Sequence, residues 1–411
     1  MNQGYKRIAF ALTISLFVSA FCAPTPAFAA ASEQVLYSFC SYTGCDGYQP
    51  VAPLVMDAAG NLYGTAAFGG TYNNGVVFEL SPSGGTWTYT VLHYFGSSEN
   101  DGGSPLGGLI FDANGNLYGT TSVGGANGPG TVFEMTPNGD GTWTETVLYS
   151  FNGTDGNYPQ AGVGFDTNGN LYGTTTYGGT NSTACNNGCG VVFQLQPGSN
   201  GTWTEKVLHN FNRNGKDGWW PRGGVILDAS GNVYGTTIYG GTPDYGTVFE
   251  LSPATGGKWT YKLIHEFSST NGGPYAPVVL DSSGNLYGVT DYVFELSPGA
   301  SGHWTYKAIA SLNTIGGIGA YGGLTFNSKG NLYGTTTESV GGDGLVFEVA
   351  NLGSGKWQGR VIHNFEYDGN NGDYDGSEPW AGVIFDSKGN MYGVTAEGGT
   401  NNSGTVFEIS P

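Results

Sequence analysis

The residues with the clearest binding chemistry are aromatic and charged side chains in the second half of the chain. Six of the nine tryptophans recur at one position of a repeat, and the other three are Trp219, Trp220 and Trp380. Flat aromatic faces suit stacking on sugar rings, and neighbouring polar groups can recognise hydroxyls. The candidate ligand-binding set is Trp219, Trp220, Arg222, Tyr275, Asp291, Tyr292, Tyr321 and Trp380.

Catalysis in the same region would need a pair of carboxylates at the separation that glycoside hydrolysis uses. The local candidates are Asp217, Asp291, Asp375 and Glu378. The sequence holds no nucleophile motif, phosphate-binding loop or metal-ligand spacing that supports catalysis more directly. We therefore place a carbohydrate- or polymer-binding protein first. An extracellular carbohydrate-active hydrolase or lyase comes second, and a protein-interaction scaffold third.

A tandem repeat must position these residues. The element G-N-[LVM]-Y-G-[TV] occurs seven times with a mean period of about 55 residues. Each unit contains four β-rich runs, which in the second unit are residues 107–111, 116–121, 131–135 and 143–151. Glycine-rich turns separate the runs. The asparagine of the element is Asn61, Asn116, Asn170, Asn232, Asn285, Asn331 and Asn390 in the seven successive copies.

Seven units of four antiparallel strands predict an all-β, seven-bladed β-propeller. The two ends of the chain predict how the ring closes. Residues 34–39 match the fourth run of a unit, whereas residues 404–411 are a third run with no fourth run after it. We therefore expect the N-terminal strand to complete the last blade, which leaves no open edge.

The repeat unit has four motifs in order: G-N-L-Y-G-T-T, G-G, G-T-V-F-E-L-S-P and G-x-W-T. It resembles the repeats of the GloVer tandem-repeat proteins of bacterial cell surfaces. The resemblance covers residues 33–411. It implies an exported propeller whose biochemical role the family does not define. Many members carry a C-terminal sorting anchor, and this sequence shows none, so we expect no anchor.

Residues repeated in every blade are expected to be scaffold, so departures from the repeat indicate the site. If the first run of each unit is innermost, the loop before the first run and the loop after the second run lie on the same face of the ring. The residue before the small pair of each first run then lies at the channel mouth. These seven positions are Val51, Leu106, Gln160, Arg222, Tyr275, Tyr321 and Trp380. The fifth unit has also lost the loop between its second and third runs, which places Asp291 and Tyr292 directly between strands.

Two further repeated positions carry titratable groups. Histidines recur in the fourth run and are expected to be scaffold: His93, His209, His265 and His363. Aspartates recur in Asp-Gly loops on the loop-rich face, where capping of the turn is the expected role. An acidic collar that attracts calcium is the alternative for Asp46, Asp101, Asp155, Asp217 and Asp375. Apart from calcium, the sequence indicates no cofactor or metal.

Composition and the N-terminus indicate location. Lys6 and Arg7 precede an apolar run and small residues before Ala30, which predicts a signal peptide over 1–29 and one propeller domain over 30–411. With 13 basic against 32 acidic residues, the net charge of −19 argues against nucleic-acid binding. We expect an exported, monomeric protein without a membrane span. The expected disulfides join close cysteines in two pairs, Cys40 with Cys45 and Cys185 with Cys189.

Overall fold

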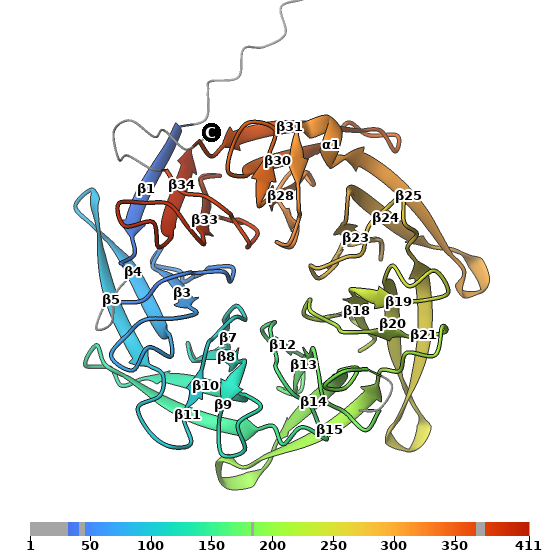
Figure 1. Ribbon diagram of the computed structural model, residues 1–411, viewed down its shortest axis with the longest axis horizontal. Coiled ribbons are helices and arrows are strands. Elements are labelled where there is room, and N and C mark those ends of the chain that lie inside the picture. Colours follow the sequence, from blue (N-terminus) through green and yellow to red (C-terminus); the bar gives the residue numbers. More distant parts are fainter. Residues whose placement is uncertain (1–31, 41–45, 182–184, 367–374, 411) are drawn as a thin grey trace, which may run out of the picture. The chain divides into compact units, whose positions relative to one another are not determined.

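The computed structural model describes residues 32–40, 46–181, 185–366 and 375–410. The chain divides into residues 1–30 and 31–411, and all of the described residues belong to the second unit. They form seven four-stranded sheets arranged as blades around a ring (Figure 1). The predicted seven-bladed β-propeller is therefore confirmed. The predicted signal peptide lies outside the described residues and stays a prediction.

Each blade runs from a very short inner strand to a long outer strand (Figure 1). The inner strands are β2 (Val55–Met56), β7 (Ile110–Phe111), β12 (Gly164–Phe165), β17 (Ile226–Leu227), β22 (Val279–Leu280), β27 (Thr325–Phe326) and β32 (Ile384–Phe385). The second strands are β3 (Leu62–Ala66), β8 (Leu117–Thr121), β13 (Leu171–Thr175), β18 (Val233–Thr237), β23 (Leu286–Val289), β28 (Leu332–Thr336) and β33 (Met391–Thr395).

The third and fourth strands form the outer half of each blade. The third strands are β4 (Val76–Ser83), β10 (Thr131–Pro137), β14 (Val191–Pro197), β20 (Thr247–Ala254), β24 (Tyr292–Pro298), β30 (Leu345–Asn351) and β34 (Thr405–Ser410). The outermost strands are β5 (Thr86–Tyr94), β11 (Trp143–Ser150), β15 (Trp203–Asn210), β21 (Lys258–Glu266), β25 (Trp304–Ser311), β31 (Trp357–Asn364) and β1 (Ser32–Ser38).

The N-terminal strand closes the ring. In the seventh blade, β1 pairs antiparallel with β34, so that Gln34 lies opposite Glu408 and Ser38 opposite Thr405. Figure 1 shows the two ends of the coloured chain side by side in this blade. The predicted complementarity of the chain ends is thus confirmed, and β34 is not left as an exposed edge.

Three small two-stranded sheets link the loops of one face. They pair β6 (Gly102–Gly103) with β9 (Val123–Gly124), β16 (Gly218–Trp219) with β19 (Tyr239–Gly240), and β26 (Gly317–Ile318) with β29 (Glu338–Ser339). In each, the loop before an inner strand pairs with the loop after the second strand, so these two loop sets share a face as expected. Helix is confined, within the described residues, to α1 (Leu312–Ile315) and 3₁₀ turns at Ser199–Gly201, Thr255–Gly257 and Ala300–Gly302.

The core lies between adjacent blades and is built from phenylalanines. Phe95, at the end of β5, packs edge-on against Phe133 of the next blade, with the ring centroids 5.1 Å apart. The same pairing recurs around the ring, and both rings are fully buried. The fifth blade differs, because Leu312 takes the place of the first phenylalanine and packs in the cluster of Phe347.

The blades converge near the axis, so the residue three positions before each inner strand is small, either glycine or alanine. A Cβ atom on Gly107 would lie 2.6 Å from backbone atoms of Ala161 and Gly162 in the next blade. The inner strands are two residues long, shorter than the five-residue runs expected from sequence. Threonines of the second strands join the blades, as where the Thr120 hydroxyl donates to the Ala161 carbonyl at 2.9 Å. No helix in the described part of the chain is long and apolar enough to span a membrane.

Candidate binding pocket

A pocket of about 740 Å³ occupies the centre of the ring, between the inner strands and the residues before them. The predicted order of strands, with the first run innermost, is therefore correct. All seven positions expected at the channel mouth line this pocket: Val51, Leu106, Gln160, Arg222, Tyr275, Tyr321 and Trp380.

A turn before each of these residues fixes where its side chain emerges. In the fourth blade, Trp220 precedes Pro221 and Arg222; its N–H donates to Cys189 of the preceding blade and its carbonyl accepts from Ile238 of its own blade. Trp220 has φ 58°, a left-handed conformation that is uncommon for a bulky residue and marks a strongly constrained site. Gln49, Ser104, Tyr158 and Glu378 have the same conformation at the same position.

Four of the predicted ligand-binding residues form one aromatic wall of the pocket. The rings of Tyr321 and Trp380 stack with centroids 4.6 Å apart, and Tyr275 meets Tyr321 edge-on at 4.7 Å. The Arg222 guanidinium carbon lies 5.8 Å from the Tyr275 ring centroid and 5.7 Å from that of Trp380. All four side chains are half-buried. The structure thus gathers residues from four successive blades into one surface.

The pocket is mainly apolar, with few charges. Among the described lining residues, Arg222 is the one Lys or Arg and Glu378 is the one carboxylate. The Trp380 indole N–H donates to Glu378 Oε2 at 3.2 Å, so the carboxylate lies at the edge of the ring whose face meets Arg222. Burial raises the pKa of Tyr275, which keeps its phenol neutral.

Trp219 and Trp220 lie outside the lining of this pocket and form a second aromatic cluster. Their ring centroids are 4.7 Å apart, and Trp219 stacks on Tyr239 at 4.6 Å. Both indole N–H groups are engaged, that of Trp219 with Asp244 Oδ1 at 2.9 Å and that of Trp220 with the Gly188 carbonyl at 3.1 Å. Trp219 is 8% exposed. These two tryptophans therefore pack on each other and on a neighbouring loop tyrosine.

Asp291 and Tyr292 are also outside the pocket lining. Only Thr290 and Asp291 separate β23 from β24, as the missing loop predicts. The Asp291 N–H donates to the Asn271 carbonyl at 3.1 Å and its own carbonyl accepts from Leu312 at 3.1 Å. These two residues therefore form a tight connection between strands, and no contact joins them to the aromatic wall among the described residues.

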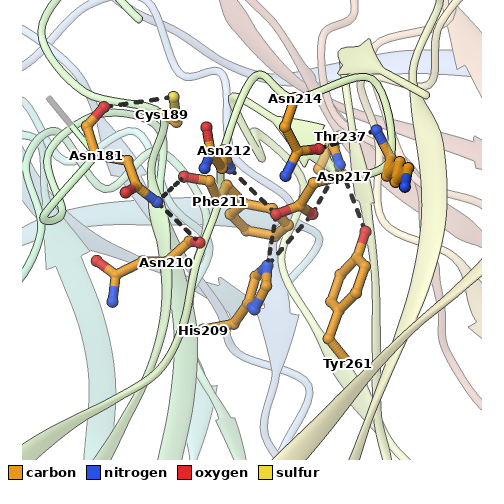
Figure 2. A network of polar contacts seen from close by, with 12 residues as sticks. Asn181, Cys189, His209, Asn210, Phe211, Asn212, Asn214, Asp217, Thr237 and Tyr261 are labelled. Atoms are coloured by element: carbon orange, nitrogen blue, oxygen red, sulfur yellow. Dashed lines mark hydrogen bonds and ion pairs between the residues drawn. The ribbon is translucent and has the colours of Figure 1, made fainter. Parts of the chain in front are cut away.

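The loop aspartates bind the outermost strand that precedes their loop and do not form an open collar. Asp217 accepts hydrogen bonds from His209 Nε2 at 3.0 Å, the Asn212 N–H at 3.1 Å and the Gly218 N–H at 2.8 Å (Figure 2). Asp101 binds His93 in the same way, and Asp375 binds His363. These contacts support the turn-capping interpretation of the aspartates and the scaffold role of the histidines.

Two places on the boundary between blades hold the donor set that a divalent cation could use. In one, ligand atoms of His93, Asp101 and Glu145 lie within 4.8 Å of one another, and in the other those of Glu33, His363 and Asp375 do so. Both lie on outer strands and the loops that follow them, away from the central pocket. In each group the histidine Nε2 already lies within hydrogen-bond distance of its aspartate, at 3.2 Å for His93 and 3.0 Å for His363.

One predicted disulfide is present in the described part of the chain. Cys185 and Cys189 are joined, and both are buried in the cluster that also contains Trp219. The other predicted pair includes Cys45, which lies outside the described residues, so the Cys40–Cys45 bond stays a prediction.

Sequence reasoning missed two residues of the pocket. Gln49 and Tyr158 line it, and each precedes the proline that comes before a channel residue. Glu378 occupies the same position, and the sequence singles it out only as a catalytic candidate. The signal that could have found all three is the residue–proline–residue pattern that precedes six of the seven inner strands.

Solved structures with the same fold have low sequence identity to the chain. The extracellular domain of a putative hybrid two-component system from B. thetaiotaomicron aligns with TM-score 0.56 and 14% identity. The alignment covers 93% of this chain but 42% of that one, so the chain spans less than half its length. A protein from Lactobacillus plantarum aligns with TM-score 0.50 and 16% identity, over 76% of this chain and 86% of that one.

A puromycin-hydrolyzing peptidase from Mycobacterium tuberculosis aligns with TM-score 0.51 and 10% identity, over 88% of this chain and 53% of that one. At these identities the matches show the fold alone.

No curated protein matches the chain. A family model matches residues 27–185 and 177–300, which together span about two thirds of the sequence. The chain therefore belongs to the family of the Gloeobacter/Verrucomicrobia repeat.

Proposed function

We propose that this protein is an exported β-propeller that binds carbohydrate in its central pocket. The observation that carries the proposal is the aromatic wall of Tyr275, Tyr321 and Trp380, which is half-buried in a concave site with Arg222 beside it. Ligand sites typically combine such apolar, aromatic linings with a few polar groups that fix orientation. A sugar ring offers an apolar face to the aromatic rings and hydroxyls to Arg222, Gln160 and Glu378.

Binding is favoured over hydrolysis by the number of carboxylates. Hydrolysis of a glycosidic bond uses two carboxyl groups on either side of the bond. Glu378 is the one carboxylate that lines the pocket among the described residues. Of the other candidates, Asp217 and Asp375 are bound by histidines of the outermost strands that precede them, and Asp291 lies in a strand connection.

Export is supported by three independent features. The N-terminal sequence has the pattern of a signal peptide, and Cys185 and Cys189 form a disulfide, which is typical of oxidising compartments. The similar structure from B. thetaiotaomicron is an extracellular domain.

The test is isothermal titration of the mature chain with soluble cell-surface and plant polysaccharide fragments. We expect saturable binding to at least one fragment and a loss of tenfold or more in affinity for Trp380→Ala. Tyr245→Ala is the control, because this tyrosine lies in a loop on the same face, is 42% exposed and does not line the pocket. Equal losses in the two variants, or no binding to any fragment, would contradict the proposal.

The same samples should be assayed for new reducing ends and for unsaturated products. Binding without products agrees with the proposal. Products that disappear in Glu378→Gln would instead establish the carbohydrate-active enzyme.

A further inference from the structure

We infer that the saccharide held in this pocket is acidic, and that its carboxylate pairs with Arg222. This inference rests on the proposed carbohydrate binding and names the chemical class of the ligand. It depends on how one cation is placed in a pocket that is otherwise apolar and aromatic.

Arg222 has no anionic partner in the described part of the protein. None of the ion pairs and hydrogen bonds found there involves it, whereas the other two arginines of the described residues, Arg213 and Arg360, each pair with a carboxylate. The protein carries 32 acidic residues against 13 basic ones, so partners for a cation are plentiful. Among the described arginines, the one that lines the pocket is therefore the one without a carboxylate partner.

The aromatic rings hold the guanidinium and leave it able to bind an anion. Arg222 lies near the faces of Tyr275 and Trp380, at 5.8 Å and 5.7 Å from the ring centroids. Contacts of this kind attract the cation but use none of its N–H groups, because the ring interacts through its π face. The planar guanidinium presents donors in a fork that matches the two oxygens of a carboxylate. The half-buried setting strengthens such a pair relative to water.

Glu378 determines which way the ligand lies. Its carboxylate accepts from the Trp380 indole N–H at the edge of the ring, while Arg222 lies over the ring face. An acidic group near Glu378 would be repelled, and a hydroxyl there would donate to it. The two charges, one at the edge of the Trp380 ring and one over its face, therefore orient a uronic acid with its carboxylate toward Arg222 and its hydroxyls toward Glu378.

The experiment compares each acidic sugar with its own neutral derivative. Oligomers of galacturonic, glucuronic, mannuronic and guluronic acid are titrated into the mature chain, each beside its methyl ester and beside neutral oligosaccharides of equal length. The ester removes the charge and keeps the ring. We expect at least one uronate oligomer to bind at least tenfold more tightly than its ester, since hydrogen bonds to a charged group are stronger than those to a neutral one.

Variants then assign the difference to one residue. Arg222→Gln should lower the affinity for the acid to that of the ester and leave the ester unchanged, and Arg222→Lys should restore part of the difference. Arg213→Gln is the matched control, because Arg213 also lies over a tryptophan, 4.9 Å from the Trp219 centroid, yet outside the central pocket. It should change neither affinity. Near-UV circular dichroism of Arg222→Gln confirms that the aromatic wall is intact.

The outcomes separate the inference from the proposed function. Equal binding of acid and ester, or binding of neutral oligosaccharides alone, would overturn the acidic-ligand inference and leave carbohydrate binding standing. An unchanged preference for the acid in Arg222→Gln would overturn the role of Arg222. No binding of any saccharide would overturn both.

Discussion

The ring of Tyr37 stacks on the ring of Tyr89, with centroids 4.1 Å apart and planes 7° from parallel. Tyr37 belongs to the N-terminal strand β1, which completes the seventh blade, and Tyr89 belongs to β5 of the first blade. At every blade boundary, the two corresponding positions of the adjacent outermost strands also face each other, and they hold other residues there. The other pairs are His93–Glu145, Tyr149–Glu205, His209–Tyr261, His265–Tyr306, Ala310–Gly359 and His363–Glu33.

Tyr37→Ala should weaken the closure of the ring. The substitution removes the stacked pair and the edge-on contact of Tyr37 with Phe39, whose centroids are 5.1 Å apart. We expect a loss of about 2 kcal/mol in the free energy of unfolding, measured by urea denaturation. Tyr72→Ala is the control, because that side chain is 51% exposed. A loss no larger than that of the control would show that β1 is held by its backbone pairing alone.

Glu205→Gln should change how stability depends on pH. Burial raises the pKa of Glu205 to about 7, with a further increase from the charge of Asp155, and its Oε1 atom is buried without a hydrogen-bond partner. The groups that face it are Tyr149 and Asp155. Because the folded-state pKa exceeds the ordinary value of 4.5, the folded state binds the proton more tightly. Its stabilising contribution is complete below pH 4.5 and is lost as the pH rises through 7.

Melting temperatures of the wild type and Glu205→Gln at about pH 5 and pH 8 measure this effect. The variant stays neutral, so we expect it to gain stability relative to the wild type between the two pH values. Glu99→Gln, at an exposed loop position, should show no such gain. Parallel pH profiles for all three proteins would mean that the Glu205 carboxyl is already ionised in the folded protein at the lower pH.

We expect His265 to give the opposite dependence of stability on pH, in the acid range. Burial lowers its pKa to about 4, and the charge of Glu266 opposes this only in part. The folded state therefore disfavours protonation, so the stabilising contribution is complete above pH 6.5 and is lost as the pH falls toward 4. His265→Phe keeps an aromatic ring on Tyr306, which His265 meets at 4.3 Å, and removes the titration.

We expect His265→Phe to lose less stability than the wild type between about pH 7 and pH 4, measured by thermal unfolding. His303→Phe, at an exposed position, is the control. If the wild type and His265→Phe respond to acid equally, protonation of His265 does not limit stability at low pH.

Most of the fold was predictable because each unit repeats the same physical requirements. The turn after each inner strand shows this: Asp112 Oδ1 accepts from the N–H groups of Asn114 and Asn116, which is why Asp and Asn recur at that spacing. The strand order, the shared face of the two loop sets and the closing strand follow from such local rules together with antiparallel pairing.

The site was predictable only at positions that the repeat itself places near the axis. Arg222, Tyr275, Tyr321 and Trp380 meet because each stands at the same register before an inner strand. Trp219 and Trp220 depart from the repeat just as clearly, yet they pack on loop residues of their own region. The direction of a loop side chain depends on contacts such as the left-handed turn at Trp220, which composition does not reveal.

The disulfide provides a test that the two aromatic clusters are separate. Cys185 and Cys189 lie in the cluster of Trp219, and the Cys189 carbonyl accepts from the Trp220 N–H at 2.9 Å. In Cys185→Ser/Cys189→Ser, the loop around Trp220 should loosen, with a red shift of tryptophan emission that is absent when Trp220→Phe is added. A disulfide that closes so short a loop removes little entropy from the unfolded chain, so the loss of stability should be about 1–2 kcal/mol.

The affinity of the central pocket for its ligand should stay within twofold of the wild type, because none of its described lining residues contacts this disulfide. A tenfold loss of affinity would show instead that the Trp220 turn, which leads directly into Arg222, transmits the state of the disulfide to the pocket.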